Sequence, residues 1–138
     1  MKNLYSIIRS GLLATALVST SALADLSDIL SSGKVKIAVP EAFAPFGSVG
    51  ATGDHEGYDV DVAKLIAKDL GVELELVPVV SKQRIPFLET DRVDLVISTM
   101  GANPSRAKSI NFSSAYAPFY SGIFTPSTVT INGAADLK

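Results

Sequence analysis

Residues 58–80, YDVDVAKLIAKDLGVELELVPVV, decide the fold of this chain. The first part predicts a helix, because four apolar residues fall on one helical face. These are Val62, Leu65, Ile66 and Leu70. Gly71 is placed to end the helix, and VELELVPVV then alternates apolar and acidic residues as a strand does. A helix followed at once by a strand is typical of a parallel α/β sheet.

The charges of this helix follow the direction of its dipole. Asp59 and Asp61 lie near the expected positive end, and Lys64 and Lys68 lie toward the negative end. We interpret them as capping and solvated groups, and not as a catalytic carboxylate pair.

The flanking segments extend the pattern. DLSDILSSG (25–33) predicts a short helix, and VKIAVP (35–40) predicts a strand with Val35, Ile37 and Val39 on one face. The Gly- and Pro-rich residues 41–57 predict a long loop, and loops of that length are often functional.

Downstream, RIPFLETDR (84–92) predicts a second short helix, and VDLVIS (93–98) predicts a third strand. The helix carries Ile85, Phe87 and Leu88 as its apolar residues. The order of strand, helix, strand, helix, strand predicts an α/β fold with an open, mainly parallel sheet flanked by helices. In such sheets ligands bind outside the carboxyl ends of the strands, here the loops PEAFAPFG (40–47) and STMGANPSR (98–106).

Composition narrows the possible functions. The 138 residues suit about one domain, and 47% hydrophobic with 19% charged residues indicates a globular chain. A net charge of −2 gives no basic surface for nucleic acid. The chain has no cysteine, which excludes disulfides and thiolate chemistry, and the lone His55 is interpreted as a solvated loop residue. We therefore expect no metal and no cofactor.

The first residues resemble an export signal. Lys2 and Arg9 precede the uncharged run GLLATALVSTSALA (11–24), which is too short to span a membrane and ends in a small-x-small pattern. We expect residues 1–24 to be a signal peptide cleaved after Ala24, which changes the net charge to −4. The alternative is a short buried helix.

Arg106 is the residue of the strand-end loop that most needs an explanation. Asn103 and Pro104 predict a helix start, which would place Arg106 in a first turn that favours anions. A carboxylate in front of this turn would explain it, since arginine binds carboxylates with two parallel hydrogen bonds. Gly101 would let a small ligand approach the backbone. A surface ion pair is the alternative, and the residues alone leave both open.

Phe43 and Phe46 offer an apolar surface in the first loop. One of them could cover a ligand's side chain while the other lies in the core. Both could equally lie in the core.

Several motifs together resemble a known family. IAVPEAFAPFG, GYDVDVAKLIAKDLG, RIPFLETDRVDLVISTMGANPSRAKSINFSSAY and YSGIF follow the order and spacing of the bacterial solute-binding proteins of polar amino-acid ABC transporters. The resemblance covers nearly all of residues 33–138. It implies a two-lobed periplasmic receptor, monomeric at full length, that closes on an amino acid and presents it to a membrane permease. Such receptors are not enzymes.

The resemblance also implies roles for single residues. Arg106 would hold the α-carboxylate with the backbone N–H of Gly101, and the carbonyl of Thr99 would accept from the α-ammonium. Phe43 would pack on the ligand's side chain, and Ser81 falls near a second aromatic of some relatives.

Four positions depart from the family pattern. Gly101 stands where many relatives have Thr or Ser, and Ser81 puts an aromatic clamp in doubt. Pro40 replaces an acid that some relatives carry. Asn103 replaces a frequent threonine but can cap in the same way.

The resemblance implies a domain division as well. Residues 25–116 would form ligand-binding lobe 1, and residues 117–138 the hinge crossing and the start of a truncated lobe 2. We therefore expect a fragment of a receptor that binds weakly or not at all by itself. The alternatives are a periplasmic cyclohexadienyl (arogenate) dehydratase, with Glu41 or His55 as general acid, and the ligand-binding part of a sensory receptor.

Overall fold

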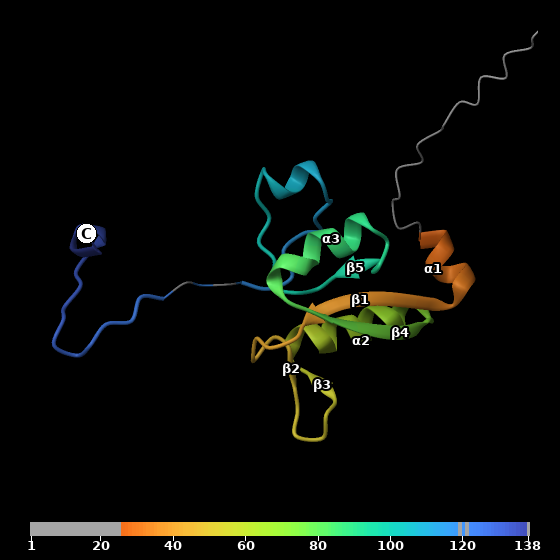
Figure 1. Ribbon diagram of the computed structural model, residues 1–138, viewed down its shortest axis with the longest axis horizontal. Coiled ribbons are helices and arrows are strands. Elements are labelled where there is room, and N and C mark those ends of the chain that lie inside the picture. The colour runs from red at the N-terminus through yellow and green to blue at the C-terminus, as the bar shows by residue number, and fades with distance from the viewer. Residues whose placement is uncertain (1–25, 119, 121, 138) are drawn as a thin grey trace, which may run out of the picture.

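The computed structural model describes residues 26–118, 120 and 122–137, and its centre is a parallel sheet (Figure 1). The strands are β1 (Lys34–Pro40), β4 (Glu73–Val79) and β5 (Leu95–Val96), in the spatial order β4-β1-β5. β1 pairs with β4 from Lys34↔Glu73 to Pro40↔Val79. It pairs with β5 at Ile37↔Leu95 and Ala38↔Val96. The predicted parallel α/β sheet is confirmed.

Helices cover both faces of the sheet. α1 (Leu26–Ser32) leads into β1 through Gly33, whose φ of 68° is easily adopted by glycine. α2 (Tyr58–Leu70) ends at Gly71 in the left-handed conformation, as predicted. α3 (Arg84–Glu89) follows a single 3₁₀ turn, η1 (Ser81–Gln83).

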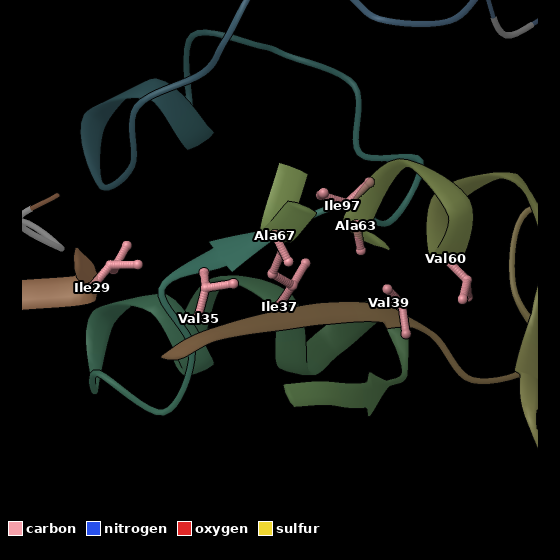
Figure 2. Close-up of a cluster of buried hydrophobic side chains, with 8 residues drawn as sticks. All are labelled: Ile29, Val35, Ile37, Val39, Val60, Ala63, Ala67 and Ile97. Carbon is pink, nitrogen blue, oxygen red and sulfur yellow. The ribbon is translucent and has the colours of Figure 1, made fainter. Parts of the chain in front are cut away.

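Alternate residues of β1 contact the two layers. Val35, Ile37 and Val39 are fully buried in the cluster that also contains residues of α2 (Figure 2). Ala38 belongs to a second cluster, against which Phe87 and Leu88 of α3 pack. The prediction that Val35, Ile37 and Val39 share one face is confirmed, and α2 and α3 pack on opposite faces of the sheet.

The buried face of α2 differs from the predicted one. Val60, Ala63 and Ala67 face the sheet, whereas Leu65 is 57% exposed. Val62, Ile66 and Leu70 are only partly buried at the margin of the cluster. The small side chains of the two alanines are the ones pressed against β1, so the prediction that Leu65 belongs to the core face is wrong.

The two acids at the start of α2 have different environments. Asp61 is exposed and pairs with Lys64 at 3.3 Å, which agrees with its interpretation as a solvated group. Asp59 is 0% exposed. Its interpretation as a capping or solvated charge is therefore wrong.

The predicted loop 41–57 contains a small hairpin. β2 (Ser48–Val49) and β3 (His55–Glu56) pair antiparallel, and the amide of Gly50 donates to the carbonyl of Asp54 at 2.8 Å in the turn between them. His55 thus lies in a strand and is partly buried, with its Nδ1 shielded from solvent. The prediction of a solvated loop histidine is wrong.

The chain after β5 has little regular structure. The predicted strand 93–98 is reduced to two residues, and the predicted helix start near Asn103 is the single 3₁₀ turn η2 (Arg106–Lys108). Another 3₁₀ turn, η3 (Ala134–Leu137), lies in the segment that runs away from the sheet in Figure 1.

The described structure does not test two predictions about the organisation of the chain. The signal peptide lies outside the described residues, and the division into a lobe at 25–116 and a crossing at 117–138 stays a prediction. Within the described part of the chain, no helix is long and apolar enough to cross a membrane.

Candidate functional site

A cavity of about 290 Å³ lies at the carboxyl end of the sheet. The chain leaving β1 contributes residues 40–43, the chain leaving β4 contributes residues 79–81, and Arg84 and Thr99 complete the lining. We predicted a ligand site at this edge, and the loops after the first and third strands do meet here.

Three of the five predicted binding residues share this cavity. Phe43, Ser81 and Thr99 come from three separate connections and line it together. Thr99 also lines a second cavity, which contains Gly101. Arg106 lines neither of the two.

Phe43 is 43% exposed and stacks on Phe46, with ring centroids 5.6 Å apart and an interplanar angle of 15°. The alternative in which both rings lie in the core is therefore wrong. The amide of Gly47 donates to the carbonyl of Phe43 at 3.1 Å and closes the turn. A Cβ on Gly47 would collide with the carbonyl of Pro40, so this tight turn requires glycine.

Thr99 has a backbone conformation that a β-branched residue rarely adopts. Its φ is 46°, in the left-handed region, and it directly follows the buried Ser98. Strain of this kind is often found at binding sites, because the surrounding structure must hold it in place. The strain falls at the position where the two cavities meet.

Arg106 is held by its own loop. Its backbone amide donates to Oδ1 of Asn103 at 3.0 Å, which confirms the predicted cap. Its Nη1 donates to the carbonyl of Gly101 at 2.8 Å. A guanidinium has five N–H donors, so this bond orients the group and leaves donors for a ligand. Among the described residues no acid pairs with Arg106, and the surface ion pair we considered is not found there.

The loop geometry around Gly101 fits an approaching ligand. A Cβ built at this glycine would meet no atom within 4 Å. The space beside it is open, so the missing side chain is not explained by packing within the described chain.

Arg84 was not singled out from the sequence. It is the first residue of α3, lines the 290 Å³ cavity, and has an Nε that is shielded from solvent without a hydrogen-bond partner in the described chain. Burial lowers the pKa of its guanidinium, and the positive charge of Arg106 lowers it further. The sequence offered one indication of this role: Arg84 begins the predicted helix that follows the end of the second predicted strand.

The second cavity, of about 210 Å³, lies between the loop at 99–102 and residues 112–118. Asp59 reaches this cavity from the first turn of α2. The hydroxyl of Tyr116 donates to Oδ1 of Asp59 at 2.9 Å, and the hydroxyl of Tyr58 donates to the carbonyl of Tyr116 at 3.3 Å. The two tyrosine rings stack at 6.2 Å with an interplanar angle of 7°.

Burial raises the pKa of Asp59, although the hydrogen bond from Tyr116, the backbone of Thr99 and the charge of Arg84 all act against this shift. Its Oδ2 accepts no hydrogen bond within the part of the chain described. Sequence analysis missed this buried pair, because an acid at a helix start is normally a surface feature.

The described residues contain no group of three or more His, Cys, Asp or Glu side chains arranged to hold an ion.

Comparison with known proteins adds a family match. Residues 35–131 match the family model of the bacterial extracellular solute-binding proteins, family 3. The glutamine-binding protein of Geobacillus stearothermophilus is 37% identical over 117 residues, which cover 82% of this chain and 45% of that protein. The chain thus spans less than half the length of this curated relative.

A solved structure and an enzyme are also similar. The arginine-bound form of domain 1 from TmArgBP, the ArgBP of T. maritima, is 39% identical with a TM-score of 0.62, covering 64% of this chain and 71% of that one. The cyclohexadienyl dehydratase of Pseudomonas aeruginosa is 32% identical over 91 residues, covering 66% of this chain and 34% of the enzyme. The fold is therefore that of the periplasmic binding proteins of type II, present here in part.

Proposed function

Because this chain belongs to the bacterial extracellular solute-binding proteins of family 3, we propose that it binds an α-amino acid outside the cytoplasm for delivery to the permease of an ABC transporter. The observation that carries the proposal is the cavity at the carboxyl end of the sheet. Phe43, Ser81 and Thr99, chosen from the sequence as ligand contacts, line it together.

Each part of an amino acid has a group that suits it. Arg106, oriented by the carbonyl of Gly101, has free N–H donors for the α-carboxylate, and the amide of Gly101 adds one more. The carbonyl of Thr99 accepts from the α-ammonium. The exposed ring of Phe43 covers the ligand's side chain.

The names of the relatives support this class of ligand. One is a glutamine-binding protein, and another is an isolated domain 1 in its arginine-bound form. A single domain with its amino acid favours weak but measurable binding by the present chain. We propose that residues 25–116 form this binding lobe and that residues 117–138 lead toward a second lobe.

The first prediction concerns Arg106. We expect the chain to bind amino acids weakly in an NMR chemical-shift titration, a measurement suited to millimolar affinities. Arg106→Ala should weaken binding at least about tenfold, since a hydrogen-bonded charge pair is lost.

Lys108→Ala is the matched control. Lys108 lies in the same 3₁₀ turn, is exposed and is not a predicted ligand contact, so its loss should leave affinity within about twofold. Gly101→Ala should fold normally, because its Cβ meets no atom, and should bind less well if the ligand approaches this backbone. Equal affinity for Arg106→Ala and the unchanged chain would show that the carboxylate is held elsewhere.

The similarity to a dehydratase suggests a second candidate function. Elimination from a cyclohexadienyl substrate needs a positioned general acid. Glu41 lines the 290 Å³ cavity, whereas His55 lies in β3 and lines neither cavity. We propose binding without catalysis, and formation of product from arogenate or prephenate would contradict it.

A further inference from the structure

Arg84 places a positive charge at the cavity and forms no ion pair among the described residues. Arg84 is one of the residues that line the cavity at the strand ends, and its Nε is shielded from water without a hydrogen-bond partner in the described residues. Taking a charged donor out of water without a partner is costly. The position therefore gains from an acceptor that enters the cavity from outside the chain.

The acids near Arg84 do not supply that acceptor. Glu41 lines the same cavity but is exposed and forms no ion pair with Arg84. The negative charge of Asp59 raises the pKa of Arg84, but the two side chains form no ion pair, and Oδ1 of Asp59 accepts from Tyr116. No ion pair involving Arg84 or Arg106 occurs among the residues that the structure describes.

A second arginine adds to the positive charge that acts on Arg84. The positive charge of Arg106 acts on Arg84 strongly enough to lower the pKa of Arg84. Two guanidinium groups near each other repel, and an anionic group between or beside them removes this repulsion. A ligand with one carboxylate can satisfy only one of the two arginines in the two-bond geometry.

We propose that the amino acid bound here carries a carboxylate on its side chain, and that Arg84 is the residue that selects it. The inference rests on the proposed function, in which Arg106 takes the α-carboxylate. Arg84, from the first turn of α3, takes the side-chain carboxylate in the cavity that Phe43 also lines. Ser81 lines the same cavity as Arg84 and is smaller than the aromatic residue of some relatives, so it leaves room for the side-chain carboxylate and offers a hydroxyl to it.

The test compares ligands that differ only in this group. The chain is titrated with glutamate, glutamine, aspartate and asparagine in NMR or calorimetric experiments at one salt concentration. We expect each acid to bind about tenfold or more tightly than its amide, the ratio typical of one charge-assisted pair.

Variants assign the preference to Arg84. Arg84→Gln should remove the preference for glutamate over glutamine while changing glutamine affinity by about twofold or less. Arg84→Lys should keep part of it, because lysine retains the charge but not the fork of donors. Lys82→Gln, in the adjacent 3₁₀ turn and outside the cavity lining, removes an equal charge and should keep the preference.

The outcomes separate the inference from the proposed function. Binding of glutamine with equal or higher affinity than glutamate overturns the inference and leaves amino-acid binding intact. If Arg84→Gln weakens the binding of glutamate and of glutamine by the same factor, the inference is likewise overturned and amino-acid binding stands. If a folded chain, verified by circular dichroism, binds none of the four but binds another α-amino acid, only the inference is wrong. If it binds no α-amino acid at all, both proposals are wrong. The ligand comparison on the unchanged chain decides the matter even if Arg84→Gln does not fold.

Discussion

Asp59 is the residue whose environment has the clearest effect on stability. Its carboxyl is fully buried, and burial raises its folded-state pKa above the ordinary value of 3.8. A raised folded-state pKa means that its contribution to stability is fully present below pH 3.8 and is lost as the pH rises through the folded-state pKa. Asp59 in its ionised form therefore costs stability at neutral pH.

We predict that Asp59→Asn is more stable than the unchanged chain at pH 7. The amide oxygen can still accept from Tyr116, and the buried charge is gone. The difference in free energy of unfolding should grow from pH 4 toward pH 7, measured by urea unfolding at several pH values. Asp61→Asn, which changes the exposed acid two residues away, should leave the pH dependence unaltered. A constant difference between Asp59→Asn and the unchanged chain across this range would contradict the prediction.

The residues that the sequence predicted well are those set by neighbours in the chain. Asn103 caps its turn through a bond to Arg106, three positions away. The buried Asp59 instead accepts a hydrogen bond from Tyr116, 57 residues away. At a helix start, Asp59 and Asp61 look alike in sequence, and only the distant partner distinguishes them. Arg84 was missed for the same reason, since the cavity that it lines is built from three connections.

At the scale of elements, the segments with a clear apolar period were predicted, whereas the β2–β3 hairpin was missed and the third strand was predicted too long. α1, β1, α2, β4 and α3 each follow a clear apolar period and occur where expected. The β2–β3 hairpin has only two residues in each strand, which is too short to show an alternation of apolar and polar residues. It is closed by a backbone hydrogen bond between residues 50 and 54. β5 consists of only the two residues that pair with β1, although the apolar run predicted as a strand is six residues long.

The rotation of α2 could not be read from its apolar pattern. Leucine and isoleucine dominate a hydrophobicity pattern, yet the close approach of α2 to β1 requires small side chains at Ala63 and Ala67. Because the alanines face the sheet, Leu65 lies on the exposed side of α2.

A pair of substitutions in α2 tests this packing. Ala63→Leu adds volume to a fully buried position and should destabilise the chain by about 1–3 kcal/mol. Leu65→Lys changes an exposed position in the same helix and should alter stability by less than about 0.5 kcal/mol. Urea unfolding of both variants gives the comparison. Equal losses would mean that α2 turns Leu65 toward the sheet.

At the scale of the whole molecule, the segment after the second cavity leaves apolar side chains in water. Tyr120 is 85% exposed and Phe124 is 95% exposed. Exposed apolar groups of this size promote association. The sheet also has β4 and β5 at its two edges, so neither strand is covered by another strand in the described residues.

We predict that the chain associates as its concentration rises. The double substitution Tyr120→Ser with Phe124→Ser should reduce the increase in average mass measured by sedimentation or light scattering. Val49→Ser, at an exposed position in the β2–β3 hairpin, is a control that should not. If the double variant associates as strongly as the unchanged chain, the sheet edges are the better explanation.

The strand order has a consequence for the time at which the site forms. β1 and β4 pair along seven residues and are connected through α2, so this half can assemble once residues up to 79 have left the ribosome. β5 is held to β1 by contacts such as the amide of Lys36 with Oδ2 of Asp94, 58 positions apart and 2.7 Å long. Such distant closures are slow steps in folding, and synthesis proceeds from the amino end. Thr99 follows β5, so the cavity gains its last wall only after this strand docks, and a nascent chain acquires its stable half before it acquires the ability to recognise a ligand.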